Sequence, residues 1–462
     1  MAISSSLGVG SGMDINGIVN QLVAAEGQPQ KDAVTRQTTA ANAQLSGLGS
    51  LKSALSTFKT SVQKLTDGSL FKSHQATSTN ETILKVTAGA GSVAGAHILQ
   101  VTQLAKAQNS ISNTEFTGST EVVGSGTLTF SVGTKTPFSL TIDASNNTLA
   151  GIRDAINGSS GNNGVTASII NVNNSTNTGT ISKLVLTAKE TGVANAFSVA
   201  VTGDAGLSRL DTSTPASFTG VAAADAKILI DGQAATRSSN VMSDVLQGIT
   251  LNLQSAVPGT NVNVDIKLDN AAIKQTISDF VTAYNALNST TDKLGKFAGT
   301  SGGTNGALVG DSTLRSIRND LRQQTSSPVT SASDSFNSLK TIGIDIDKTG
   351  VMTLDSAKLD KALAANLSSV SDVFSSTDGV ATRLNTKINQ YLQTGGPLDT
   401  RQKSLNKQLK KLSDRSDTIQ LHLDNVQKTL LKQFIAMDVA VGKFQSTGAF
   451  LTNQLANLIS SK

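Results

Sequence analysis

The C-terminal end of the chain carries an apolar stripe that repeats in steps of three and four residues from Leu405 to Leu458. Fourteen of its sixteen positions are apolar, and this spacing places them on one face of a single helix. With a rise of about 1.5 Å per residue, an unbroken helix over the stripe would be roughly 80 Å long. A bare apolar face of that length is unfavourable in water, so the sequence predicts a partner helix. The sixteen positions are Leu405, Leu409, Leu412, Ser416, Ile419, Leu423, Val426, Leu430, Phe434, Met437, Val441, Phe444, Gly448, Leu451, Leu455 and Leu458.

The second half of this stripe contains three irregular points. The step from Leu430 to Phe434 is four residues where three are due, and such a stutter unwinds a supercoil locally. Gly442 and Gly448 each weaken a helix by about 1 kcal/mol relative to alanine. The far end of the helix is therefore expected to be marginal alone and to order against a partner.

The N-terminal end carries a second apolar stripe of similar character. Asp14 is predicted to cap a short helix that Gly27 and Pro29 end, and a longer helix follows with a seven-residue apolar repeat. The two ends of the chain are expected to meet as an antiparallel stalk, with everything between about residues 70 and 268 as an insertion. The apolar residues are Ile15, Ile18, Val19, Leu22 and Val23, then Val34, Ala41, Leu48, Leu51, Leu55, Phe58, Val62 and Leu65.

The hydrophobic period changes to two inside the insertion, which predicts strands. Clusters of Gly, Asn and Ser such as 157–164 separate the strands, and one helix, 149–157, interrupts them behind the cap residue Thr148. After residue 270 the helical period returns. The predicted strands are 83–87, 97–101, 127–132, 138–142, 165–172, 181–187, 197–202, 227–230, 249–253 and 262–268, and the later helices are 273–287, 314–321 and 357–363.

Together these patterns predict an α+β multidomain protein. Its terminal helices form an antiparallel coiled-coil leg, and mainly-β head domains are inserted into that leg. The length of 462 residues gives room for about three domains.

Composition argues against several functional classes. The chain has no cysteine, which excludes disulfides, thiolate metal sites and cysteine nucleophiles. Its net charge of +5 is local, because 401–432 holds eight Lys or Arg against three Asp. No nucleic-acid-binding motif accompanies this segment, so a solvated helical face is the better interpretation. No apolar run exceeds four residues, so neither a cleaved signal peptide nor a membrane span is expected.

No motif in the sequence indicates an enzyme, a metal site or a cofactor site. The three histidines, His74, His97 and His422, lie far apart. The run 345–350 resembles the first half of a calcium loop, but Ser356 stands where a bidentate Glu is needed, and the flanks predict a hairpin. The glycines of 8–12 precede a helix without the Lys that a phosphate loop requires. Carboxylates brought together only by folding stay an open alternative.

Several segments resemble one family, the bacterial flagellar filament cap proteins, also called hook-associated protein 2. The resemblance covers the whole chain and is carried by the N-terminal run 5–14, by 49–55, by 94–105, by 248–251 and 306–312, and by the tail from Lys432 to Leu455. The helix 149–157 followed by 165–170 is similar to the motif that flagellin and hook-associated proteins share. Gly47 beside Gly49 and the Asn-rich run 171–174 depart modestly from the family pattern.

The resemblance implies a division into four parts. Residues 1–44 and 431–462 would be the terminal coiled-coil segment that contacts the filament. Residues 45–70 and 270–430 would form the helical leg domain. An inner β head domain would comprise 71–118 and 224–269, and 119–223 would be the outer β head domain. The expected contacts for the filament and for self-assembly are Ile15, Ile18, Leu22, Phe434, Met437, Val441, Phe444, Leu451, Leu455 and Leu458.

The resemblance also implies function and partners. The protein would form a ring homo-oligomer at the distal tip of the flagellum, where arriving flagellin folds and inserts. It would leave the cell by the flagellar type III export system without a cleaved signal, with an export chaperone on its C-terminal helix. Hook-filament junction proteins are further expected partners, and host-surface glycans are candidate ligands; no nucleic acid, membrane or cofactor is expected.

Two alternative classes stay open at the level of sequence. One is a structural relative, flagellin or a hook-filament junction protein, which would share the helical ends and the motif at 149–170. The other is a secreted adhesin or a glycan-acting enzyme built on the β-rich segment.

Overall fold

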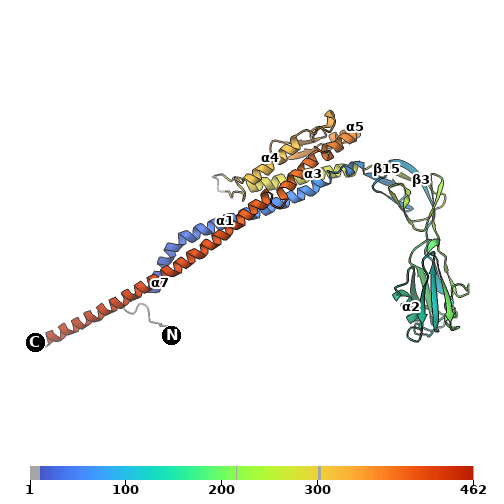
Figure 1. The fold of residues 1–462 in the computed structure, drawn as a ribbon, viewed down its shortest axis with the longest axis horizontal. Coiled ribbons are helices and arrows are strands. Elements are labelled where there is room, and N and C mark those ends of the chain that lie inside the picture. The colour runs from blue at the N-terminus through green and yellow to red at the C-terminus, as the bar shows by residue number, and fades with distance from the viewer. Residues whose placement is uncertain (1–10, 215, 300–302, 461–462) are drawn as a thin grey trace. The chain divides into compact units, whose positions relative to one another are not determined.

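The structure is a computed structural model that describes residues 11–214, 216–299 and 303–460, with side chains near the C-terminus described as far as residue 456. The chain divides into two compact units. A helical unit comprises Met1–Leu70 and Ala271–Lys462, and a β unit comprises Phe71–Asn270. The predicted fold class is confirmed: helices come from both ends of the chain, and the strand-rich segment lies between them (Figure 1).

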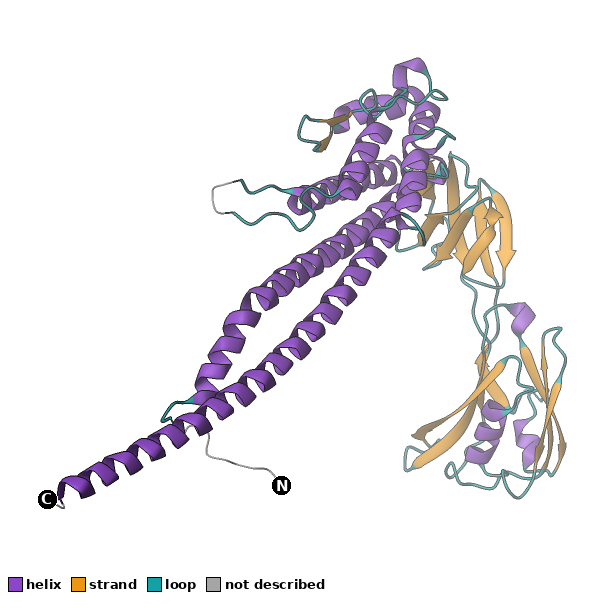
Figure 2. Cartoon of the chain, turned by 60° about the vertical axis from the view of Figure 1, so that its left-hand side comes forward, coloured by secondary structure: helices purple, strands orange, loops and turns teal. Residues whose placement is uncertain are grey.

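Two long helices dominate the helical unit. Helix α1 (Ile15–Gln63) and helix α7 (Pro397–Ser460) run side by side in opposite directions, as both views show (Figures 1 and 2). Asp14 caps α1 as predicted, because its side chain accepts a hydrogen bond from the backbone N–H of Gly17. The predicted meeting of the two chain ends is confirmed.

The prediction that Gly27 and Pro29 end the first helix is wrong, since α1 continues through both. A proline inside a helix loses one backbone hydrogen bond and crowds the preceding turn. Pro29 nevertheless lies on the exposed side of α1, while Val23 and Val34 on either side of it pack against α7. The packing of these neighbouring turns holds the helix together across the proline.

Shorter helices complete the helical unit around an aromatic core. They are α3 (Asn270–Gly295), α4 (Ser312–Ser326), α5 (Ser356–Ser375), which is kinked at Asn366, and α6 (Val380–Leu392). Phe280 of α3 lies between Phe58 of α1 and Phe374 of α5, with ring-centroid distances of 5.6 and 6.1 Å. The hairpin of β16 (Ile344–Ile346) and β17 (Met352–Leu354) turns at Gly350 with φ of 85°, as predicted. Helix α6 was not predicted.

The β unit has an inner part made of two antiparallel sheets. The larger sheet has the order β1-β15-β3-β11-β12, and the smaller has the order β13-β14-β2. Leu99, Val101, Leu251 and Val264 are among the fully buried residues of their common core. The strands are β1 (His74–Ser78), β2 (Leu84–Ala88), β3 (Gly95–Gln103), β11 (Ala226–Ile230), β12 (Gln233–Arg237), β13 (Val241–Leu246), β14 (Ile249–Leu253) and β15 (Val262–Leu268).

The outer part of the β unit also has two sheets, with the orders β10-β4-β8-β7 and β6-β5-β9. Helix α2 (Leu149–Gly158) contributes Leu149, Ile152 and Ile156 to the core of this part, and Thr148 caps it as predicted. The strands are β4 (Asn109–Ser112), β5 (Gly126–Val132), β6 (Phe138–Ile142), β7 (Val165–Asn173), β8 (Thr180–Ala188), β9 (Phe197–Gly203) and β10 (Phe218–Val221).

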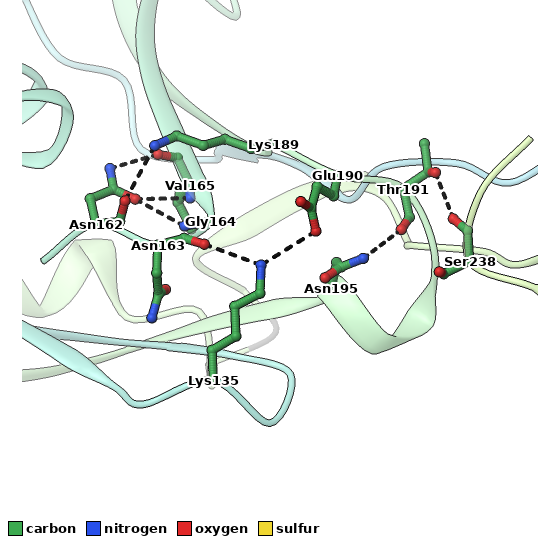
Figure 3. Close-up of polar contacts among 10 residues, drawn as sticks. All are labelled: Lys135, Asn162, Asn163, Gly164, Val165, Lys189, Glu190, Thr191, Asn195 and Ser238. Atoms are coloured by element: carbon green, nitrogen blue, oxygen red, sulfur yellow. Dashed lines mark hydrogen bonds and ion pairs between the residues drawn. The ribbon is translucent and has the colours of Figure 1, made fainter. Parts of the chain in front are cut away.

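A polar cluster joins a turn of the outer part to the inner part of the β unit (Figure 3). The Asn162 side chain accepts hydrogen bonds from the backbone N–H groups of Gly164 and Val165 and thereby shapes the loop before β7. The Thr191 hydroxyl donates to the backbone oxygen of Ser238 at 2.6 Å. Gly192, with φ of 96°, lies so close to Ser238 that a Cβ atom there would be 2.3 Å from the serine Cβ. Only glycine fits this contact without displacing the backbone.

Candidate functional site

Polar contacts fix the antiparallel register of α1 and α7. The amide of Gln427 donates to Asn20 at 3.0 Å, and Lys31 donates to Gln420 at 2.9 Å. His422 Nε2 lies 3.3 Å from a carboxylate oxygen of Glu26. Moving along α1 toward its C-terminal end therefore means moving along α7 toward its N-terminal end.

The apolar seam between the two helices contains Val34, Leu412, Ile419 and Leu423, with Val23 packed against them. Gly27 is buried directly opposite Leu423, and a Cβ atom at this glycine would lie 2.3 Å from the leucine Cδ1. The absence of a side chain at Gly27 lets the helices approach closely. This glycine is thus a packing residue of the seam, where the sequence suggested a helix end.

Burial along the stripe of α7 falls toward the C-terminus. Leu405, Leu412, Ile419 and Leu423 are at most 6% exposed. Val426, Leu430 and Phe434 are half-buried. The last buried side chain in the described part of α7 is a carboxylate, Asp438, at 9% exposure.

Asp438 holds the segment that leads into α1. Its Oδ1 accepts hydrogen bonds from the backbone N–H of Ser11 at 2.7 Å and from the Ser11 hydroxyl at 2.5 Å. Hydrogen bonds to a carboxylate are stronger than those between neutral groups. The contact ties residues that are 427 positions apart in the chain and marks the end of the described pairing.

Beyond Asp438, α7 extends as an overhang, residues 439–460, past the start of α1 (Figure 2). Five large apolar side chains of this overhang are more than half exposed: Phe444 at 77%, Phe450 at 62%, Leu455 at 59%, Leu451 at 56% and Val439 at 53%. Phe444, Leu451 and Leu455 share the face of the stripe. A contiguous exposed apolar face usually marks a contact surface. Within the described residues the overhang has the length and the apolar face to bind another helix or protein.

The residues expected to make assembly contacts fall into different environments. Ile15 is 1% exposed and belongs to the core, Ile18 is half-buried, and Leu22 is 45% exposed. Phe434 and Val441 are half-buried, whereas Met437, Phe444, Leu451 and Leu455 are exposed. The side chain of Leu458 lies outside the described residues. The structure thus gathers Met437, Phe444, Leu451 and Leu455 on the exposed end of α7.

Sequence reasoning missed Asp438, Ser11 and the role of Gly27. A lone aspartate one residue after a stripe position carries no separate signal in a helical pattern. A glycine opposite a large leucine could be recognised only once the register of the two helices is known.

The described residues contain no cluster of metal ligands and no helix that could span a membrane. Among them, no three His, Asp or Glu side chains lie close enough together to hold a metal ion. The Asp347 carboxylate accepts hydrogen bonds from Thr349 and Val351 of its own turn, which lower its pKa. No helix in this part of the chain is long and apolar enough to cross a membrane.

Comparison with known proteins identifies relatives over the full length of the chain. Residues 11–108 match the family described as flagellar hook-associated protein 2 N-terminus, and 223–446 match its C-terminus. The A-type flagellar hook-associated protein 2 of Pseudomonas aeruginosa is 32% identical over 479 residues, which cover 99% of this chain and 98% of the relative. Flagellar hook-associated protein 2 of Escherichia coli K12 is 34% identical over 480 residues, the whole of both chains.

A solved structure shares the fold. The crystal structure of the D1-D2-D3 domains of the flagellar cap protein FliD from Escherichia coli aligns with a TM-score of 0.66 at 35% identity. The alignment covers 78% of this chain and 99% of that one. Because two family segments match and full-length relatives exceed 30% identity, the chain belongs to the flagellar hook-associated protein 2 (FliD) family.

Proposed function

We propose that this protein is a flagellar filament cap, an oligomeric assembly at the distal tip that promotes the folding and insertion of flagellin as the filament grows. The observation that carries the proposal is the overhang of α7, whose apolar face is exposed in the described chain. Membership of a family whose solved relative from Escherichia coli is a flagellar cap protein supports the same function. The work is steric: the protein positions other chains and makes or breaks no covalent bond.

The helical ends are proposed to contact the filament, with Met437, Phe444, Leu451 and Leu455 as the central contacts. These side chains are exposed on a helix that is paired for most of its length, so they are held in place without being covered. Apolar helix faces associate by burying such side chains against a partner. The filament end, made of flagellin, is the partner that this proposal assigns to them.

Further partners follow from the same proposal. Copies of the chain would form a ring, and the hook-filament junction proteins would receive the ring before filament growth. An export chaperone would cover the C-terminal part of α7 until the chain leaves the cell through the flagellar type III system. Covering is needed because the exposed large apolar residues of the overhang would promote aggregation.

The experiment that tests this function is a truncation. Deletion of residues 434–462 removes the overhang and Asp438 but leaves the buried seam at Leu412, Ile419 and Leu423. We expect the purified truncated protein to keep the circular dichroism of a folded helical and β-containing protein. Cells that express it as their only copy should secrete flagellin without forming filaments.

The matched control changes the β unit instead of the overhang. Substitution Val93→Ala removes part of one 65% exposed apolar side chain and should leave filament growth intact. Filaments of normal length and number from the truncation strain would contradict the proposed function.

A further inference from the structure

Two cavities lie between helices α3 and α4 of the helical unit. The first has a volume of about 190 Å³, and Tyr284, Asn288 and Arg322 are among the residues that line it. The second has a volume of about 510 Å³, with Lys293 and Lys296 in its wall. Asn288 and Arg318 line both, so the two cavities adjoin, and together they are treated as one groove.

The charges in this groove are strongly one-sided. Arg315, Arg318 and Arg322 lie on one face of α4 at spacings of three and four residues, and Lys293 and Lys296 lie near the C-terminal end of α3. These five residues define the basic groove. The single carboxylate in its lining is Asp292, which pairs with Arg318 at 2.6 Å.

The other four cations of the basic groove lack a carboxylate partner in the described chain. Arg315, Arg322, Lys293 and Lys296 are exposed, and no ion pair to a described carboxylate is formed by any of them. The carboxylate of Asp347 accepts hydrogen bonds from Thr349 and Val351 of its own turn and forms no ion pair with these cations. Like charges this close raise the free energy of the groove unless an anion neutralises them.

The floor of the first cavity is formed by three buried side chains. Tyr284, Leu287 and Leu321 are 5%, 1% and 7% exposed. Burial raises the pKa of Tyr284, and the charges of Arg322 and Arg318 act in the opposite direction, which places both guanidinium groups near the phenol. A side chain with a short aliphatic part and a terminal carboxylate would place its aliphatic part on these buried residues and its carboxylate beside the arginines.

We propose that the basic groove binds an acidic segment of another protein chain. One carboxylate would bind over the row from Arg315 to Arg322, where planar guanidinium groups offer paired donors. A second would bind near Lys293 and Lys296. The proposal goes beyond the filament contacts proposed for α7, because it concerns a different surface of the helical unit.

The length of the groove favours a chain segment over a single small anion. From Tyr284 to Gly295, α3 extends roughly 17 Å. Lys293 and Lys296 lie at one end of this distance, and Arg322 lines the same cavity as Tyr284 at the other. A single phosphate could contact only one end of it. An extended segment rises about 3.3 Å per residue, so roughly six residues could reach cations at both ends.

The test uses the full-length purified protein and two fluorescein-labelled peptides. One peptide has four glutamates separated by serines, and the other has glutamine in place of each glutamate. Fluorescence anisotropy should show binding of the glutamate peptide that weakens as salt rises, and much weaker binding of the glutamine peptide. The variant Arg315→Gln/Arg322→Gln should weaken binding of the glutamate peptide about five- to tenfold, as expected for two exposed ion pairs.

Two further variants separate this site from general charge attraction. Lys407→Gln/Lys411→Gln on α7 removes the same charge from exposed positions outside the groove and should leave binding within about twofold. Arg315→Lys/Arg322→Lys keeps the charge but removes the planar guanidinium groups. It should therefore bind the glutamate peptide more tightly than the glutamine variant but less tightly than the parent protein. All variants should keep the unfolding midpoint of the parent protein, because the substituted side chains are exposed.

Several outcomes would overturn the proposal. The groove would not be the binding site if the glutamate peptide failed to bind at low salt. The same conclusion would follow if the α7 control variant lost as much affinity as the arginine variant. Complete displacement of the peptide by inorganic phosphate at matched ionic strength would show that the groove binds a small anion. Tighter binding of a single-stranded oligonucleotide that the same arginine variant abolishes would assign it to nucleic acid. Each readout is independent of filament growth, so it can fail while the proposed cap function holds.

Discussion

The two halves of α7 carry one apolar stripe but differ in what covers it. In the first half, Leu412 and Leu423 are buried against α1, and Gly27 leaves room for the Leu423 side chain. In the second half, Phe444 and Leu451 follow the same spacing on an uninterrupted helix and are 77% and 56% exposed. Spacing thus determines which residues share a face, while the length of the partner helix determines how much of that face is buried. The first half stabilises the fold, and the second stays exposed in the described chain.

The largest expected difference comes from one substitution made in both halves. Leu423→Ala should lower the free energy of unfolding of the helical unit by about 2–3 kcal/mol, because it opens a cavity in the buried seam. Leu451→Ala should change it by less than about 0.5 kcal/mol, because the side chain is already exposed. Urea unfolding followed by circular dichroism at 222 nm measures both. Equal losses would mean that the second half is also packed within the chain.

Glycine substitutions sharpen the same comparison along α1. Gly27→Ala should lower the free energy of unfolding by about 1–2 kcal/mol, because the new Cβ atom would collide with Leu423. Gly49→Ala, where nothing lies within 4 Å of the new atom, should instead stabilise the helix by about 0.5–1 kcal/mol. The double variant Gly27→Ala/Leu423→Ala should lose less than the sum of its single variants, since the colliding atoms are gone. Additive losses would show that the two residues are not in contact.

The boundary between the halves can be tested at Asp438. Asp438→Ala should lower the free energy of local unfolding of residues 11–15 by about 1 kcal/mol, because the Ser11 N–H and hydroxyl lose a charged acceptor. Hydrogen–deuterium exchange of the backbone around Ile15 should become faster. The control Thr452→Ala removes a hydroxyl that bonds only within α7 and should leave this exchange unchanged. Unaltered exchange in Asp438→Ala would mean that the carboxylate does not anchor the N-terminal segment.

The smallest expected effect is local to the overhang. Gly448→Ala meets no atom within 4 Å and should strengthen the helix there by about 1 kcal/mol or less. Exchange should slow between 444 and 452 while the global unfolding midpoint stays constant. A shift of the global midpoint would indicate that the overhang unfolds together with the paired half.

Much of the fold was predictable because its periodicity is strong. The apolar repeats of α1 and α7 were recognised, although the ends of these helices were not. The strands Phe138–Ile142, Ile249–Leu253 and Val262–Leu268 were predicted with the bounds that the structure has. Strands β1, β4, β10, β12 and β13 were missed. Sequences such as His74–Ser78 or Asn109–Ser112 are polar, and they become strands through pairing with distant neighbours such as β15 and β8.

The candidate site was predictable only in outline. The stripe indicated which residues of α7 share a face, but not where α1 stops covering them. That limit depends on the tertiary register, which contacts such as Gln427 with Asn20 and Asp438 with Ser11 define. The helix end predicted at Pro29 was wrong for a related reason. Local propensity predicts a break at proline, whereas packing of the flanking turns against α7 keeps α1 continuous. The basic groove joins parts of α3 and α4 that carry no shared motif.

The central claim is that the exposed face of the overhang makes the assembly contact. The most direct measurement compares Leu451→Asp with the parent protein in cells that lack their own copy, counting filaments by electron microscopy and measuring secreted protein. We predict a secreted and folded variant with unchanged circular dichroism but few or no filaments, because burying a charge at an apolar contact costs a large free energy. Normal filament number and length in the Leu451→Asp strain would contradict it.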